Sequence, residues 1–94
     1  MRKEINPKIQ AAATSYAARF SYGTTLCHFI VFSLKGDGVT DRIAYSERRA
    51  KAWAYQSGGE CFAVQPIAGE NGATITRLKP LTSAQWRAMM LGRR

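Results

Sequence analysis

The hydrophobic positions near the start of the chain recur three or four residues apart, which is the spacing of a helix that buries one face. Asn6 can cap this helix with its side chain, and Pro7 suits its first position because the backbone N–H that proline lacks is unpaired there. The helix is expected to end before Gly23. The residues of its buried stripe are Ile9, Ala13, Tyr16 and Phe20.

The hydrophobic spacing changes to two over residues 26–34, which predicts a strand. Both faces of this strand are largely apolar, so it should lie inside a sheet that is covered on both sides. Residues 35–38 are rich in types that tolerate a positive φ, and they predict a tight turn. Residues 39–45 would then return as the partner strand.

A second helix is predicted to begin after Ser46, which can cap it, and Glu47 places a negative charge in its first turn. Gly58 and Gly59 would end it. The helical spacing assigns four residues to the face that is expected to pack on the sheet. These residues are Ala50, Trp53, Ala54 and Ser57.

Two more strands are predicted over residues 61–67 and 73–78, joined by a hairpin turn at residues 70–72. The turn contains Asn-Gly, which is a strong hairpin signal because both residues accept a positive φ.

The last helix has a complete start signal. Thr82 can cap it, and Gln85 stands three residues later, as a capping box requires. The helix is expected to end near Leu91. Trp53 and Trp86 are each predicted to be mostly buried and to anchor their helices on the sheet.

The element order α-ββα-ββα predicts a two-layer α+β fold, with a four-stranded, mainly antiparallel sheet packed with three helices. The 94 residues are expected to form one small basic domain spanning residues 1–94. Its core should be thin, because Val, Ile, Leu and Phe together make up only 18 of the 94 residues.

The chain has two cysteines, Cys27 and Cys61, which is too few for a disulfide framework. We expect two buried thiols in a reducing, cytoplasmic environment, and one Cys27–Cys61 disulfide remains the alternative. No leader and no membrane-spanning segment is predicted, because no long apolar run is present.

Catalytic chemistry is not predicted, although His28 is the only histidine. A catalytic histidine needs an orienting group and a nucleophile or substrate, and the sequence shows no motif that supplies them. His28 is therefore interpreted as a hydrogen-bonded structural residue. A zinc site from Cys27, His28 and Cys61 is disfavoured because adjacent strand residues point to opposite faces. Neither a metal nor a cofactor is expected.

Positive charge is the strongest functional signal of the composition. The chain carries 14 Lys and Arg against six Asp and Glu, which gives a net charge of +8 and a pI near 10.1. Such an excess favours binding to phosphate backbones and to acidic protein surfaces alike.

The outer face of the second helix is the first candidate for a binding surface. Arg48, Lys51 and Tyr55 fall on the side that is turned away from the predicted core. Arg49 lies at the flank of that side, nearer the core stripe, and Arg42 joins it from the preceding strand. Tyr55 would offer an aromatic ring beside the basic groups. These five residues are predicted to bind the partner.

A second basic patch is predicted at the C-terminal end. It consists of Arg87 on the last helix and of Arg93 and Arg94 in the tail that follows. These residues are the next candidates if the surface around the second helix is only a solvated face.

The sequence therefore predicts a small non-enzymatic binding protein. In its shortness, its minimal loops and its lack of catalytic motifs, the chain resembles accessory proteins that phages and mobile elements encode to inhibit or redirect a host machine. This resemblance rests on no motif.

The expected partner is a host protein or nucleoprotein complex, for example a defence or nucleic-acid-processing machine, and binding to a membrane is not expected. A stand-alone DNA- or RNA-binding protein that contacts phosphates is the alternative, and a small enzyme built around His28 is a third. The oligomeric state is left open.

Overall fold

A computed structural model describes residues 4–19, 27–67 and 71–91 of the chain. Within these residues it contains the predicted order of helices and strands, α-ββα-ββα, and each predicted element is present. The bounds differ from the predicted ones by only a few residues. The elements are α1 (Pro7–Ala18), β1 (His28–Lys35), β2 (Gly38–Ala44), α2 (Glu47–Ser57), β3 (Glu60–Pro66), β4 (Ala73–Arg77) and α3 (Ser83–Leu91).

The four strands form one antiparallel sheet with the order β2-β1-β3-β4. β1 is an inner strand, as its two apolar faces predicted. Val31 on β1 lies opposite Arg42 on β2 and opposite Cys61 on β3. Residues that lie opposite each other share a face of the sheet, so this register sends the Arg42 side chain to the same face as Val31 and Cys61.

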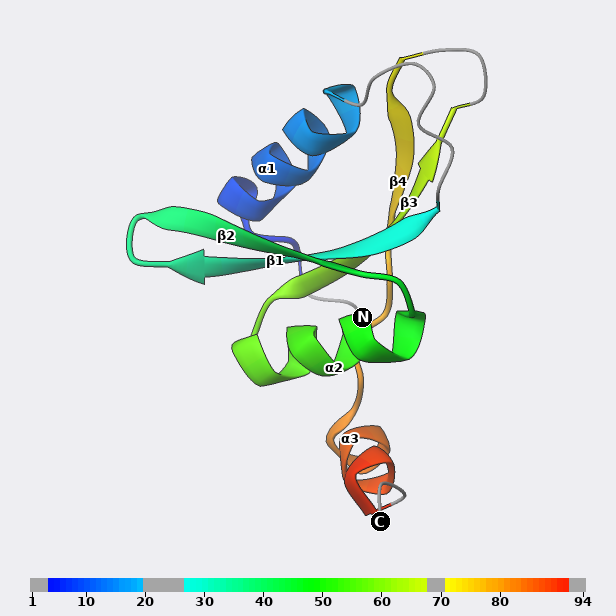
Figure 1. Ribbon diagram of the computed structural model, residues 1–94. Coiled ribbons are helices and arrows are strands. Elements are labelled where there is room, and N and C mark those ends of the chain that lie inside the picture. The colour runs from blue at the N-terminus through cyan, green and yellow to red at the C-terminus, as the bar shows by residue number, and fades with distance from the viewer. Residues whose placement is uncertain (1–3, 20–26, 68–70, 92–94) are drawn as a thin grey trace.

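The predicted fold class and sheet are confirmed, but the predicted number of layers is wrong. Figure 1 shows α1 on one side of the sheet and α2 on the other, which makes three layers. The reason lies in β1, where Ile30 and Phe32 pack under α1 while Val31 packs under α2. A strand that is apolar on both faces needs a cover on each face.

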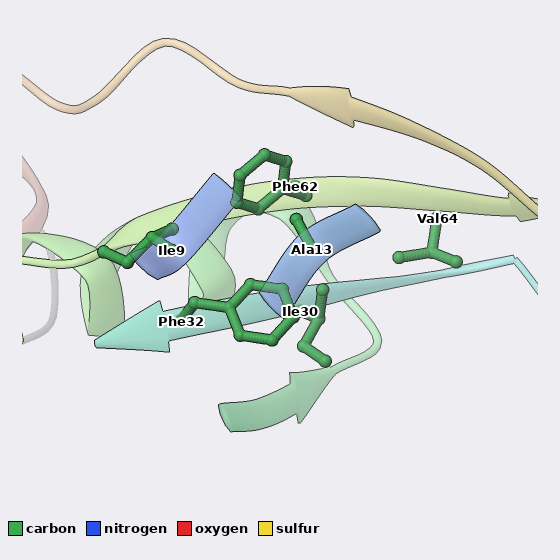
Figure 2. Packing of buried hydrophobic residues seen from close by; sticks show 6 residues of the cluster. All are labelled: Ile9, Ala13, Ile30, Phe32, Phe62 and Val64. Carbon is green, nitrogen blue, oxygen red and sulfur yellow. The ribbon is translucent and has the colours of Figure 1, made fainter. Parts of the chain in front are cut away.

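The core is divided between these two faces. On the first face, α1 contributes Ile9 and Ala13, which pack against large side chains of β1 and β3 (Figure 2). On the second face, α2 contributes Ala50 and Ala54, whose small side chains let the helix lie close to the sheet. The first cluster consists of Ile9, Ala13, Ile30, Phe32, Phe62 and Val64.

Local signals start the first two helices and end the second one as predicted, while α1 ends at Ala18 and Gly23 lies outside the described residues. Asn6 Oδ1 accepts a hydrogen bond from the backbone N–H of Lys8 at 2.9 Å, and Ser46 Oγ accepts one from Arg49 at 3.1 Å. Gly58 ends α2 in the left-handed conformation, with φ +71°. No helix in the described part of the chain combines the length and the apolar character needed to cross a bilayer.

The last helix also starts as predicted, but it packs elsewhere. Thr82 and Gln85 form the capping box, each side chain accepting a hydrogen bond from the backbone N–H of the other, at 3.1 and 2.9 Å. α3 lies beyond α2 and away from the sheet (Figure 1), and none of its residues is buried. Trp86 stacks on Tyr55 of α2, with ring centroids 4.9 Å apart and an interplanar angle of 15°.

Both tryptophans are partly buried. Trp53 packs beside the α2-side core, as predicted. The prediction that Trp86 anchors its helix on the sheet is wrong, because Trp86 attaches α3 to α2.

We expect Trp86→Ala to lower the free energy of unfolding by only about 1 kcal/mol, because it removes an aromatic stack and no buried core contact. Denaturant unfolding measures this loss, and amide exchange within Ser83–Leu91 should become faster as α3 loosens. A loss near 4 kcal/mol, the usual size for a buried Trp, would show that the ring belongs to the core after all.

Candidate docking surface

Three arginines line a hollow of about 710 Å³ that runs along α2. Arg42 comes from β2, and Arg48 and Arg49 come from the first turn of α2. α2 contributes most of the lining, and Met89 comes from α3. We call this feature the basic hollow. The residues that define it are Arg42, Ser46, Arg48, Arg49, Ala52, Trp53, Gln56 and Met89.

Trp53 organises the arginines of the basic hollow. The guanidinium carbon of Arg42 lies 3.5 Å from the centroid of the Trp53 ring, and that of Arg49 lies 6.0 Å from it. A guanidinium stacked on an indole is held by cation–π attraction and keeps its N–H groups free at the edge. Arg42 is therefore oriented before any partner arrives.

The fold explains why Arg42 reaches this tryptophan. The register opposite Val31 turns Arg42 towards the face that α2 covers. β2 ends at Ala44, and the cap Ser46 starts α2 immediately afterwards. This short connection leaves α2 little freedom relative to β2, so arginines from both elements stay together.

The acidic residue in the first turn of α2 is paired with a residue outside the hollow. Glu47 pairs with Lys51, one turn further along α2, with Oε2 and Nζ 3.0 Å apart. Arg42, Arg48 and Arg49 take part in no ion pair within the described residues. The three guanidinium groups therefore leave the hollow positive.

The five residues predicted to bind the partner separate into two groups. Arg42, Arg48 and Arg49 are brought together in the basic hollow. Lys51 does not line it and is paired with Glu47, with only 22% of its side chain exposed. Tyr55 does not line it either; one face of its ring is stacked on Trp86, although the residue stays 37% exposed.

The second predicted patch is only partly described. Arg87 is exposed on α3. Arg93 and Arg94 lie outside the described residues. The structure thus places one member of this patch and leaves its clustering untested.

Five residues of the basic hollow were not singled out from the sequence as binding residues. Trp53 was assigned to the core because of its helical position, and Ser46 was assigned as a helix cap. Ala52, Gln56 and Met89 carried no signal of their own. The available signal was the spacing of Arg49, Trp53 and Gln56, which lie on one side of a helix at intervals of four and three residues.

Arg77, another basic residue, belongs to a different site. Its guanidinium donates two hydrogen bonds to the Glu60 carboxylate, at 2.9 and 2.7 Å, and this pairing raises its pKa above the ordinary value. The pair joins the first residue of β3 to the last residue of β4 and is interpreted as structural.

His28 lies on the sheet face opposite to the basic hollow, under α1. It is buried, and a hydrogen bond of 2.8 Å joins its Nε2 to the Tyr16 hydroxyl. Burial, together with the nearby negative charge of Asp41, raises the pKa of Tyr16 above its ordinary value. The predicted hydrogen bonding of His28 is confirmed, and its structural role stays a prediction. Within the described part of the chain, no three His, Cys, Asp or Glu side chains are grouped so that they could hold a metal ion.

The prediction of two buried thiols is wrong for Cys27, which is exposed, and right for Cys61. The two do not form a disulfide. Cys61 lies opposite Val31 on β1. Cys27 precedes Val31 by four residues, which is about 13 Å at the usual rise of a strand, so the two thiols are well beyond disulfide reach.

Burial raises the pKa of the Cys61 thiol from 9.0 to about 11. The unfolded chain therefore loses this proton at a lower pH than the folded one. We expect the free energy of unfolding to be insensitive to this thiol below pH 9 and to fall by about 2–3 kcal/mol as the pH rises through the folded pKa.

The measurement is denaturant unfolding of the parent and of Cys61→Ala over the alkaline range. The variant should lack this fall while keeping the part due to other groups. Parallel curves for the two proteins would contradict the expectation.

Comparisons with protein-family models, with curated proteins and with solved structures find no match to this chain. No family is therefore assigned. The basic hollow, built from β2, α2 and the border of α3, is the feature of the described residues from which a function is best argued.

Proposed function

We propose that this protein is a small non-enzymatic binding protein that docks through its basic hollow on a larger partner. The observation that carries the proposal is the group of three arginines that line one hollow with Trp53, none of them paired to an acidic residue in the described part of the chain. Arginine is favoured at the centres of interfaces because its planar group makes several hydrogen bonds at once.

The rigidity of the surface supports this role. α2 is fixed on the sheet by Ala50 and Ala54, and Arg42 is held on the Trp53 ring. Side chains that are already ordered lose less conformational entropy when a partner binds. Charged groups held in this way can contribute net affinity rather than only attraction at long range.

The wider proposal is that the protein acts as an inhibitor or adaptor encoded by a phage or mobile element, with a host protein or nucleoprotein complex as its partner. It rests on the small size, the short connections and the basic surface. The exposed thiol of Cys27 is compatible with a reducing, cytoplasmic compartment.

Direct binding to DNA or RNA is the second candidate, and the net charge of +8 favours it. Such binding would use phosphate contacts by the arginines. Its affinity would fall steeply with salt, because each phosphate contact releases condensed counterions.

The test is capture from a host lysate on the immobilised protein, with and without nuclease treatment. The reference is a variant that carries Arg42→Glu and Arg49→Glu, which we call the reversed variant. A protein captured by the parent in both conditions, but not by the reversed variant, supports docking on a protein. Capture that nuclease abolishes supports the second candidate, and equal capture by parent and variant contradicts both.

A further inference from the structure

We infer that the basic hollow receives an acidic segment of a partner protein, in which an Asp or Glu side chain stands next to an apolar one. This inference rests on the proposed function and names the chemistry of the partner at that site. Three features of the hollow carry it: the arginine that lies over the Trp53 ring, the geometry of the arginines and the apolar part of the lining.

The aromatic ring of the lining argues against unpaired nucleic acid as the occupant. Proteins that bind single strands stack bases on open aromatic faces. Here the aromatic residue of the lining is Trp53, and Arg42 lies over one face of its ring at 3.5 Å. Trp53 holds an arginine in place, so the group that it presents to a partner is a cation.

The arginines are suited to carboxylates. A guanidinium placed over a ring keeps the N–H groups at its own edge free, and a carboxylate can accept two of them in parallel. The Arg42 guanidinium lies 3.5 Å from the centroid of the Trp53 ring, and the Arg49 guanidinium lies 6.0 Å from it. Two guanidinium groups on one concave site can hold one acidic side chain between them or two neighbouring ones.

The rest of the lining combines polar and apolar residues. Ser46 and Gln56 line the hollow together with Ala52, Trp53 and Met89. Methionine adapts its shape to apolar side chains. A concave site that combines cations with apolar groups matches a protein segment in which acidic residues stand next to apolar ones.

The experiment selects peptides from a display library of random linear sequences, using the immobilised protein as bait and the reversed variant for counter-selection. We expect enrichment of peptides in which Asp or Glu stands beside Leu, Ile, Met or Phe. Anisotropy with a labelled enriched peptide and with a labelled DNA duplex then measures affinity at physiological salt.

Arg42→Gln should weaken peptide binding by about tenfold or more, because it removes a charged hydrogen-bonding group. Met89→Gln should weaken peptide binding severalfold and leave duplex binding unchanged. Met90→Gln is the matched control, since Met90 is exposed on the same helix and does not line the hollow; it should behave like the parent.

Absence of enrichment, or equal binding of the peptides to Arg42→Gln, would overturn the inference. If capture from the lysate still depends on the basic hollow, the proposed function stands and only this partner chemistry is wrong. If the duplex binds more tightly than any selected peptide and loses affinity in the reversed variant, the occupant is nucleic acid. If neither peptides nor lysate proteins distinguish parent from reversed variant, the proposed function fails as well.

Discussion

Replacing Gly59 by alanine is expected to destabilise the protein by about 3 kcal/mol, a large part of the stability of so small a domain. A methyl group at this position would overlap the carbonyl oxygen of Phe32 and lie 2.5 Å from Ser33 Oγ. Phe32 and Ser33 belong to β1, the inner strand that is hydrogen-bonded to β2 and β3. The backbone there cannot move aside without disturbing the sheet.

Denaturant unfolding monitored by circular dichroism measures this loss, and Gly38→Ala is the matched control. Gly38 starts β2 without a positive φ, and its added methyl group would meet only the Lys35 carbonyl oxygen, at 3.9 Å. The control should unfold like the parent or be stabilised by up to about 1 kcal/mol, because alanine restricts the unfolded chain. If both variants unfold at the same midpoint, the close approach at Gly59 carries no stability.

The sequence predicted those parts of the fold that depend on neighbouring residues. The caps Asn6, Ser46 and Thr82 act within three residues of their own positions, so their signals do not depend on the tertiary structure. The inner position of β1 followed from the apolar character of both its faces. The role of Gly59 was different, since Gly58 alone explains the helix end and only the structure shows how close β1 lies.

The errors concern elements whose position depends on the path of a connection. A helix of nine residues with a good start signal says nothing about which surface it will contact. The segment after β4 carries α3 past α2 rather than back to the sheet, and this path brings Trp86 onto Tyr55. The prediction of two layers was wrong because a strand that is apolar on both faces needs a helix on each face, and this makes three layers.

In the candidate site, too, the local relations along the helix were predictable and the contacts between side chains were not. Helical spacing correctly placed Arg48 and Arg49 near each other on α2, and the position of Arg49 nearer to Trp53 is confirmed. Spacing could not show that Lys51 would be paired with Glu47 and lie outside the hollow. The angle between two side chains on a helix is local, whereas their partners depend on rotamers and on the elements packed beside them.

The reversed variant, with Arg42→Glu and Arg49→Glu, is expected to bind the captured partner about 100-fold more weakly or worse, because truncating or opposing a buried charge at an interface costs several kcal/mol. Lys51→Gln should bind like the parent, since Lys51 does not line the hollow. Titration calorimetry with the purified partner measures both affinities.

Charge itself must be separated from position. Arg19→Glu combined with Lys35→Glu removes the same net charge from exposed positions at the end of α1 and at the β1–β2 turn. This control should slow association modestly by reducing long-range attraction, while leaving the dissociation rate unchanged.

The reversed variant should keep its circular dichroism spectrum and lose only about 1 kcal/mol of stability, the usual value of a cation–π contact. If the control weakens binding as much as the reversed variant, the protein uses its overall charge rather than its basic hollow. If Lys51→Gln weakens binding instead, the working surface is the outer stripe of α2.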